Sequence, residues 1–213
     1  TRNPGDLRAD VRLDAYEMLM YELNRTHLGQ GMDIRWHNQK EIEITDAEYL
    51  EMCACKTGCL SRIVARLAAI VTDNQGVEQA VAKYAEDMAI AFQIADDVLD
   101  VEYALEEGGD FGKGVGNDIR EGKKTLMAIH AAENAPPEDA ARLEEILWAD
   151  ENTDEDVREV VEIFESVRSV EYARSVAEEL SESSKARLEG LDLEPEPASK
   201  LAAFAEFVAD RDV

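Results

Sequence analysis

The sequence predicts an all-α protein. Helix-forming residues such as Ala, Glu and Leu are abundant, only 5 of the 213 residues are proline, and no segment keeps a two-residue alternation of apolar and polar side chains. Hydrophobic residues make up 45% of the chain, which is typical of a globular protein. No linker or internal repeat divides the sequence, so we expect one helical domain over residues 1–213.

Apolar periodicity and capping patterns place the helices. The predicted helices span residues 7–28, 45–72, 76–106, 119–133, 138–149 and 153–189, and a last one follows Pro197. Thr45 with Glu48, and Thr153 with Asp156, have the spacing of helix N-caps. The segment Gly29–Asp33 is expected to interrupt the first helical stretch, as a helix end and turn.

The chain is strongly acidic. It carries 48 Asp and Glu against 22 Lys and Arg, a formal charge of −26, which argues against nucleic acid and anionic membranes as partners. The acidic residues are dispersed along the chain, and only 8 of the 22 basic residues are Lys. This composition resembles that of proteins from salt-loving archaea, and an acidic interaction surface is the alternative interpretation. There is neither an apolar run of about 18 residues nor a signal-like N-terminal segment, so we expect a cytoplasmic protein without a membrane span.

Three cysteines, Cys53, Cys55 and Cys59, lie within seven residues. Their odd number argues against a disulfide framework, and their spacing does not supply the ligand pairs of a zinc site. We expect them to be small apolar residues on a helix.

One predicted helix carries a cluster of carboxylates. At about 100° per residue, Gln93, Asp96, Asp97 and Asp100 fall on one arc about 100° wide. Carboxylates this close repel one another unless a cation compensates them, and their hard oxygens suit Mg²⁺, which also takes phosphate oxygens as ligands. In so acidic a chain, a solvated acidic face is the competing interpretation.

Lysines follow in a glycine-rich segment. Three of the chain's eight lysines lie within Gly112–Leu126, where glycines allow a ligand to approach the backbone closely. Together with the carboxylates these lysines could neutralise a diphosphate, although a flexible solvated loop would look similar. Lys56 beside Thr57 is a weaker phosphate-binding signal. The chain's histidines, His27, His37 and His130, are dispersed and are expected to be ordinary surface or core residues.

Four motifs, taken in order, resemble the trans-isoprenyl diphosphate synthase (polyprenyl synthetase) family over roughly residues 15–210. They are G-Q-x-x-D at Gly29–Asp33, K-T at Lys56–Thr57, F-Q-x-x-D-D-x-x-D at Phe92–Asp100, and G-K-x-x-G-x-D-x-x-E-G-K-x-T-L at Gly112–Leu126. The last two together are specific to this family. The resemblance implies an isoprenoid-synthase-type helical bundle around a deep cavity, and a homodimer.

The resemblance also implies roles for individual residues. Asp96, Asp97 and Asp100 would bind Mg²⁺ that bridges an allylic diphosphate. The lysines that would grip this diphosphate are Lys56, Lys113 and Lys123. Thr57 and Gln93 would support the site near the reacting carbons, while Gln30 and Asp33 would act indirectly. The implied reaction condenses isopentenyl diphosphate with an allylic diphosphate, and it requires no side-chain nucleophile.

The sequence departs from the family at its start, because no first aspartate-rich motif precedes Gly29. We therefore expect a bundle lacking its N-terminal helices, from a fragment or an incomplete sequence, and inactive alone. Two alternatives remain: a non-catalytic helical subunit that partners a full-length synthase, or a site whose other half another chain supplies. Product length cannot be predicted from these residues.

Overall fold

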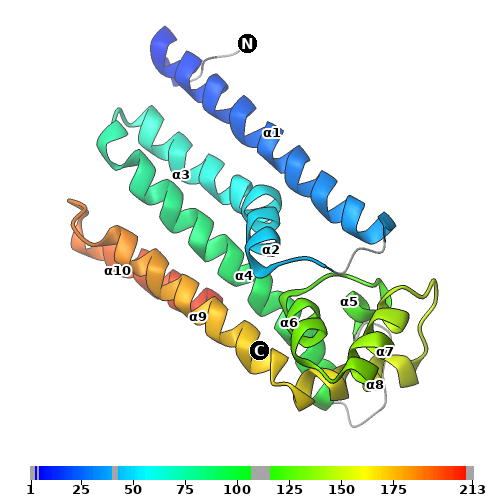
Figure 1. Cartoon of the computed structure of the whole chain (residues 1–213). Coiled ribbons are helices and arrows are strands. Elements are labelled where there is room, and N and C mark those ends of the chain that lie inside the picture. Colours follow the sequence, from blue (N-terminus) through cyan, green and yellow to red (C-terminus); the bar gives the residue numbers. More distant parts are fainter. Residues whose placement is uncertain (1–2, 4, 40–42, 107–115, 210–213) are drawn as a thin grey trace.

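The structure, a computed structural model, describes residues 3, 5–39, 43–106 and 116–209, and all secondary-structure elements of this part are helical (Figure 1). The elements are α1 (Ala9–Gln39), α2 (Asp46–Cys53), the π-helical turn η1 (Ala54–Gly58), α3 (Cys59–Val71), the 3-10 turn η2 (Gln75–Val77), α4 (Glu78–Glu106), α5 (Asn117–Arg120), α6 (Leu126–Asn134), α7 (Pro137–Leu147), α8 (Asp154–Ser166), α9 (Ser169–Leu188) and α10 (Pro195–Ala209). The all-α prediction is confirmed. Within these ranges, no helix combines the length and apolarity needed to cross a membrane.

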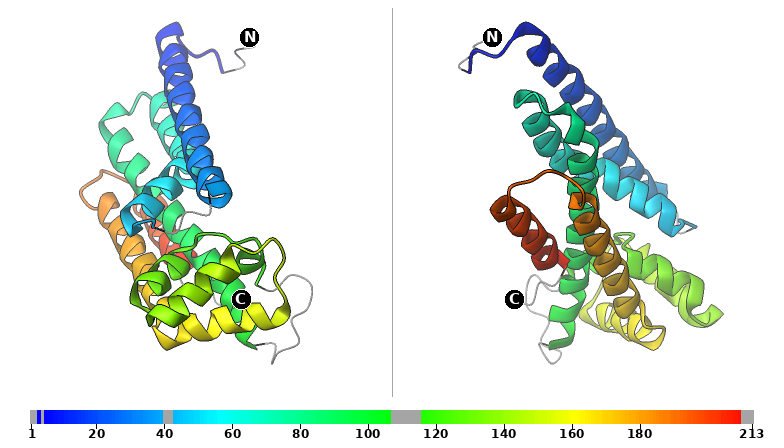
Figure 2. Two further views of the ribbon diagram at one scale, coloured as in Figure 1. Left: turned by 45° about the vertical axis from the view of Figure 1, so that its right-hand side comes forward. Right: turned by 90° about the vertical axis from the view of Figure 1, so that its left-hand side faces the viewer.

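The long helices form a row. α1 packs on α3, α3 on α4, and α4 on α9, with α10 beside α9 and α4 (Figures 1 and 2). The shorter helices α5 to α8 gather near the C-terminal end of α4 (Figure 1). α4 therefore connects the row to this second group of helices.

α1 differs from its prediction because it continues through the expected break and ends at Gln39. Gly29 is a packing residue inside the helix. A Cβ built on it would lie 2.5 Å from the backbone nitrogen of Lys56 and 2.8 Å from the Cβ of Cys55. The glycine therefore allows α1 to approach η1 closely, and this packing outweighs the cost of a glycine in a helix, about 1 kcal/mol.

The predicted caps of the next segment are confirmed. Thr45 and Glu48 form a complete capping box at the start of α2, and the helical run from there ends at Val71, one residue before the predicted end. The run is not uniformly α-helical, because Ala54–Gly58 widens into the π-helical turn η1. Such turns occur mostly as single insertions in α-helices and often at functional sites.

Two helices that the sequence predicts as continuous are each divided by a residue with left-handed backbone. Gly122, at φ +64°, separates α5 from α6 within the predicted helix 119–133. Arg168, at φ +60°, separates α8 from α9 within the predicted helix 153–189. The predictions of continuous helices were wrong because the periodicity of apolar residues does not reveal a single residue with left-handed backbone.

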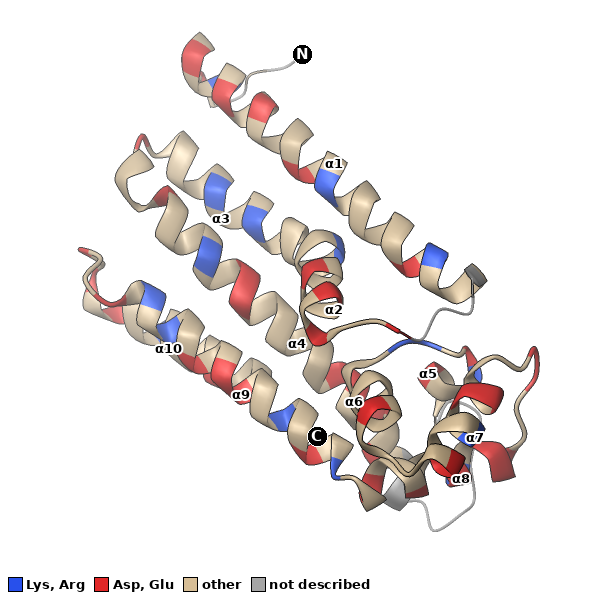
Figure 3. Cartoon of the chain, in the orientation of Figure 1, with Lys and Arg blue, Asp and Glu red and all other residues tan. Residues whose placement is uncertain are grey.

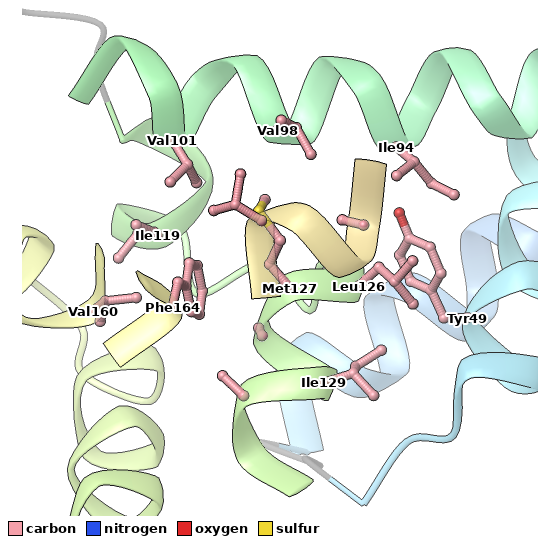
Figure 4. Packing of buried hydrophobic residues seen from close by; sticks show 14 of the residues in the cluster. Tyr49, Ile94, Val98, Val101, Ile119, Leu126, Met127, Ile129, Val160 and Phe164 are labelled. Atoms are coloured by element: carbon pink, nitrogen blue, oxygen red, sulfur yellow. The ribbon is translucent and has the colours of Figure 1, made fainter. Parts of the chain in front are cut away.

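The main apolar core fills the space between α4 and the shorter helices. Tyr49, Ile94, Val98, Leu126 and Phe164 are each at most 1% exposed and converge there from α2, α4, α6 and α8 (Figure 4). Burying side chains of this size stabilises the fold by about 1.5–3 kcal/mol each. The core therefore fixes the position of α4 relative to α2 and α6. All three cysteines are buried free thiols, as expected.

Charged residues are distributed along most of the helices (Figure 3), and one of the ionic clusters is largely buried between α1, α3 and α4. Glu22 of α1 is 1% exposed and pairs with two arginines of α3, Arg62 and Arg66, both at 2.8 Å. Arg62 also contacts Glu86 of α4. Arginine suits such sites because its planar fork can bind several carboxylate oxygens at once. The cluster holds α1, α3 and α4 in register.

Candidate functional site

Asp97 of α4 lies at the centre of a polar network. Asp97 is 2% exposed, and its carboxylate is surrounded by donors. Oδ1 accepts hydrogen bonds from Gln93 Nε2 at 2.9 Å and from Lys123 Nζ at 2.7 Å, and Oδ2 accepts one from the Tyr49 hydroxyl at 3.1 Å. Three segments, α2, α4 and the turn after α5, thus fix one carboxylate.

Lys123 connects α4 to α5. Its ammonium group donates to Asp97 and also to Asp118 Oδ2, each at 2.7 Å. Asp100 adds a second link, because its two oxygens accept the backbone N–H groups of Asn117 and Asp118 at 3.3 and 3.0 Å. The start of α5 is therefore tied to the last turns of α4.

Backbone geometry sets the direction of Lys123. Gly122 precedes it at φ +64°, and a Cβ there would lie 2.3 Å from the carbonyl oxygen of Leu147. The Lys123 N–H donates to the carbonyl of Asp118 at 2.9 Å, which closes the turn. Only glycine combines this backbone conformation with so close an approach.

The π-helical turn η1 contributes the second group of polar residues. Thr57 Oγ1 donates to Gln93 Oε1 at 3.2 Å, which joins η1 to the network of Asp97. Lys56 Nζ lies 2.6 Å from Asp33 Oδ2, a residue of α1. The close packing at Gly29 brings α1 and η1 together beside this ion pair.

Burial and the neighbouring charges shift the pKa values of this network in opposite directions. Burial raises the pKa of Asp97 to about 6, against the opposing effect of the Lys123 charge. Burial also raises the pKa of Asp100, although the Asp118 N–H favours the charged form. Burial of Lys123 favours its neutral form, but the Asp97 charge and the hydrogen bond to Asp118 outweigh it, so the pKa of Lys123 is raised. Lys123 is therefore a fixed positive charge at neutral pH.

The lysines face an open cavity of about 870 Å³. Lys56 and Lys123 line it from η1 and from the turn after α5, and Asp33 and Asp118 lie beside them. The other lining residues are Ile34, His37, Asn38, Arg120, Glu121, Gly122, Lys124, Leu147, Trp148, Ala149 and Asp150. A cavity lined by lysines from two separate segments suits a small polyanion.

The candidate residues differ in their access to solvent. Asp96 is exposed, Asp97 is buried and Asp100 is half-buried, because the arc that they occupy crosses the edge of the core. In the described part of the chain, no three His, Cys, Asp or Glu side chains form a ready-made metal-binding group. Asp96 and Asp100, one turn apart and both accessible, are the carboxylates that could hold a hydrated cation.

The structure brings most of the predicted residues together. Thr57, Gln93, Asp97 and Lys123 form one hydrogen-bonded series, and Lys56 shares the cavity of Lys123. Lys113 lies outside the described residues. Sequence reasoning did not single out Tyr49, and it assigned no contact to Asp33 or Asp118. Asp118 could have been found from its place in the Gly112–Leu126 motif; no local signal marks Tyr49.

These features define a class of protein: an all-helical protein in which a carboxylate-bearing helix is hydrogen-bonded to a lysine, and this lysine lines an open cavity together with a lysine of a second segment. The polyprenyl synthetase family model matches residues 6–164. The chain therefore belongs to the polyprenyl synthetase family.

Individual relatives agree with this assignment. Over 186 residues the chain is 38% identical to a short chain isoprenyl diphosphate synthase of Methanothermobacter thermautotrophicus, a match that covers 86% of this chain and 54% of the relative. The chain thus spans about half the length of this relative.

Solved structures show the same fold. A geranylgeranyl pyrophosphate synthetase from Pyrococcus horikoshii superposes with a TM-score of 0.84 at 29% identity, over 97% of this chain and 61% of that one. A polyprenyl synthase from Caulobacter crescentus, described as complexed with calcium and isoprenyl diphosphate, gives a TM-score of 0.81 at 26% identity, over 94% of this chain and 60% of that one. The predicted isoprenoid-synthase-type bundle is confirmed.

Proposed function

We propose that this protein is a prenyltransferase that condenses isopentenyl diphosphate with an allylic diphosphate to form a linear isoprenyl diphosphate, with Mg²⁺ as cofactor. The observation that carries the proposal is the hydrogen-bonded series Thr57–Gln93–Asp97–Lys123. It links one carboxylate of α4, Asp97, to Lys123, which lines the same cavity as Lys56, and a bound metal diphosphate requires carboxylates and lysines close together.

The residues divide into ligands and positioning groups. Asp96 and Asp100 would hold Mg²⁺, because hard carboxylate oxygens with access to solvent leave room for water and diphosphate oxygens. When bound, Mg²⁺ would stabilise the negative charge that grows on the departing diphosphate. The sequence also predicts Asp97 as a metal ligand; because it is buried and already accepts three hydrogen bonds, we propose that it positions Lys123 instead.

The remaining residues act on the substrate. Lys56 and Lys123 neutralise the diphosphate as the allylic carbon–oxygen bond ionises, and Lys113 is expected to join them. Thr57 and Gln93 would place their own side-chain oxygen and nitrogen atoms close to the substrate carbons that react. The double bond of isopentenyl diphosphate then attacks the allyl cation, and a proton is lost, with the departed diphosphate as its acceptor.

The relatives support the proposal. The Methanothermobacter relative is named a short chain isoprenyl diphosphate synthase, and the Caulobacter structure is described with a divalent cation and an isoprenyl diphosphate. We further propose one domain, a homodimer and a cytoplasmic location, as the family resemblance and the sequence suggest. Sedimentation velocity would test the homodimer.

A second candidate function is that of a non-catalytic helical subunit that partners a full-length synthase. Such a subunit would supply the part of a synthase that the match covers, which is 54% of the Methanothermobacter relative. The partner function predicts that the chain raises the turnover of another synthase and that Asp96 does not matter for this effect.

One assay separates the two functions. The protein is incubated with Mg²⁺, isopentenyl diphosphate and allylic diphosphates of several lengths, alone and with an active synthase, and products are separated by chromatography. Enzymatic function predicts that Asp96→Asn lowers turnover at least 100-fold, whereas Asp192→Asn, in the loop between α9 and α10, leaves it unchanged. Equal turnover of both variants would refute the assigned role of Asp96.

A further inference from the structure

Arg62 of α3 is a buried arginine whose guanidinium group is fully hydrogen-bonded. The residue is 5% exposed. Its Nε and Nη2 donate to Glu22 Oε2 at 3.0 and 2.8 Å, and Nη2 also donates to Cys59 Sγ at 2.8 Å. Nη1 donates to Glu86 and to the backbone carbonyl oxygen of Ala54, the latter at 3.0 Å. These contacts use all five N–H groups of the guanidinium, and the one to Ala54 reaches the backbone of η1.

The hydrogen bond to Ala54 lies where the helical run is irregular. A π-helical turn pairs N–H groups with carbonyls five residues back instead of four, so the hydrogen-bond register changes at η1. Buried backbone carbonyls need a donor, and Arg62 supplies one to Ala54, the first residue of the turn. At the last residue, Gly58, a Cβ would lie 3.4 Å from Arg62 Nη1 and 3.3 Å from Glu86 Cγ. The guanidinium therefore lies against both ends of η1.

Between these two ends, η1 carries two residues of the candidate site. Lys56 lines the cavity, and Thr57 donates to Gln93. Successive residues of a helix differ by about 100° in direction, so a change of register by one residue would turn both side chains away from their present partners. Arg62 is not among the described residues that line this cavity. Its effect on the site would therefore pass through the backbone of η1.

We propose that Arg62 is a positioning residue: its hydrogen bond to the Ala54 carbonyl holds η1 in its π-helical register and thereby directs Lys56 and Thr57 toward the bound metal diphosphate. The role of the diphosphate in this inference rests on the proposed function. Glu22 of α1 is the anchor of the arrangement, because it binds the guanidinium from the side of Nε. The buried ionic cluster thus serves the site as well as the packing of α1, α3 and α4.

Arg66 provides a matched control on the same helix. It lies four residues after Arg62 and donates to Glu22 Oε1 and Glu78 Oε1, each at 2.8 Å. Both of these partners lie outside η1. Replacement of either arginine by lysine keeps the charge but loses the planar fork that binds several acceptors at once. Both variants therefore weaken the ionic cluster, whereas Arg62→Lys also removes a donor from η1.

Hydrogen–deuterium exchange followed by mass spectrometry tests whether Arg62 holds the turn. In Arg62→Lys, the amides of Ala54–Gly58 should exchange at least tenfold faster than in the parent, with less than a twofold change in α9. In Arg66→Lys, the amides of η1 should change by less than twofold. If Arg62→Lys does not fold, Glu22→Gln replaces it, and exchange in η1 should then rise at least threefold. Equal exchange of η1 in the parent and in these Arg62 or Glu22 variants would overturn the proposal.

A double-mutant cycle tests whether the turn matters for the ligand. Inorganic diphosphate is titrated with Mg²⁺ into the parent, Arg62→Lys, Lys56→Gln and the variant that carries both changes. If Arg62 acts by placing Lys56, each single change should weaken binding at least tenfold, and the double variant should bind no more weakly than twofold below either. Arg66→Lys should stay within twofold of the parent.

Two outcomes of the titration separate the proposal from the function on which it rests. Effects of Arg62→Lys and Lys56→Gln that multiply would overturn the positioning role, because a merely structural arginine would weaken binding independently of Lys56. Absence of binding in the parent would refute the proposed function instead. The exchange rates of η1 would still decide whether Arg62 holds the turn.

Discussion

Gly29 provides a sharp test of how α1 places Lys56. Its substitution by alanine adds one methyl group where α1 meets η1. That carbon would lie 2.5 Å from the Lys56 nitrogen and 2.8 Å from the carbonyl carbon of Cys55. Both are backbone atoms, so no side-chain rotation can relieve the overlap. Gly31 is a matched control two residues away on the same helix, with no atom within 4 Å of its Cβ position.

The magnitudes follow from these distances. Overpacking against backbone costs about 3 kcal/mol, and alanine returns about 1 kcal/mol of helix propensity, so Gly29→Ala should lower the free energy of unfolding by about 2 kcal/mol. Gly31→Ala lacks the overlap and should raise it by up to about 1 kcal/mol. For a chain of this size the corresponding shifts in melting temperature are about −4 to −8 °C and +2 to +4 °C.

Urea unfolding followed by circular dichroism measures both variants. The difference between them, about 3 kcal/mol, cancels effects common to any Gly→Ala change in α1. If Gly29→Ala proved as stable as Gly31→Ala, the close packing of α1 on η1 would be refuted. The position that we assign to Lys56 would be refuted with it.

Three further predictions concern the network and its turn. Tyr49→Phe removes the buried hydroxyl that donates to Asp97 and should cost about 1.5–3 kcal/mol; an unchanged urea midpoint would contradict this hydrogen bond. Since burial raises the pKa of Asp97 from 3.8 to about 6, the folded state binds more protons than the unfolded state between these values, and stability falls as pH rises through them. Asp97→Asn should remove this pH-dependent loss of stability, which is on the order of 3 kcal/mol. Parallel profiles of stability against pH in the variant and the parent would refute the raised pKa of Asp97. Gly122→Ala should lower the free energy of unfolding by more than about 2 kcal/mol, because the backbone there is left-handed and the new Cβ would lie 2.3 Å from the Leu147 oxygen. Gly190→Ala should lower it by about 1 kcal/mol, because Gly190 is also left-handed but has no neighbouring atom within 4 Å. Equal losses in the two variants would contradict the close approach of Gly122 to Leu147.

The sequence predicts those features that depend on neighbouring residues. The capping boxes at Thr45 and Thr153 form as expected, because each joins groups only three residues apart. The shared arc of Gln93 and Asp97 follows from helical geometry, and the two side chains are hydrogen-bonded one turn apart.

Features that depend on contacts between distant segments could not be predicted. Tyr49 lies 48 residues from Asp97, and nothing in its local pattern distinguishes it from an apolar core residue. Gly29 reads as a helix end until the packing of α1 on η1 is known. The left-handed backbone of Gly122 and Arg168 likewise depends on how the short helices fold back on α4.

The central claim is that the carboxylates of α4 and the cavity lysines together bind a metal diphosphate. Isothermal titration calorimetry of Mg²⁺ and inorganic diphosphate into the protein measures this directly. Our account predicts saturable binding that requires both ligands and is weakened at least tenfold by Asp96→Asn or Lys123→Gln, with Asp192→Asn unchanged. Binding of equal strength in all variants, or diphosphate binding that is indifferent to Mg²⁺, would contradict it.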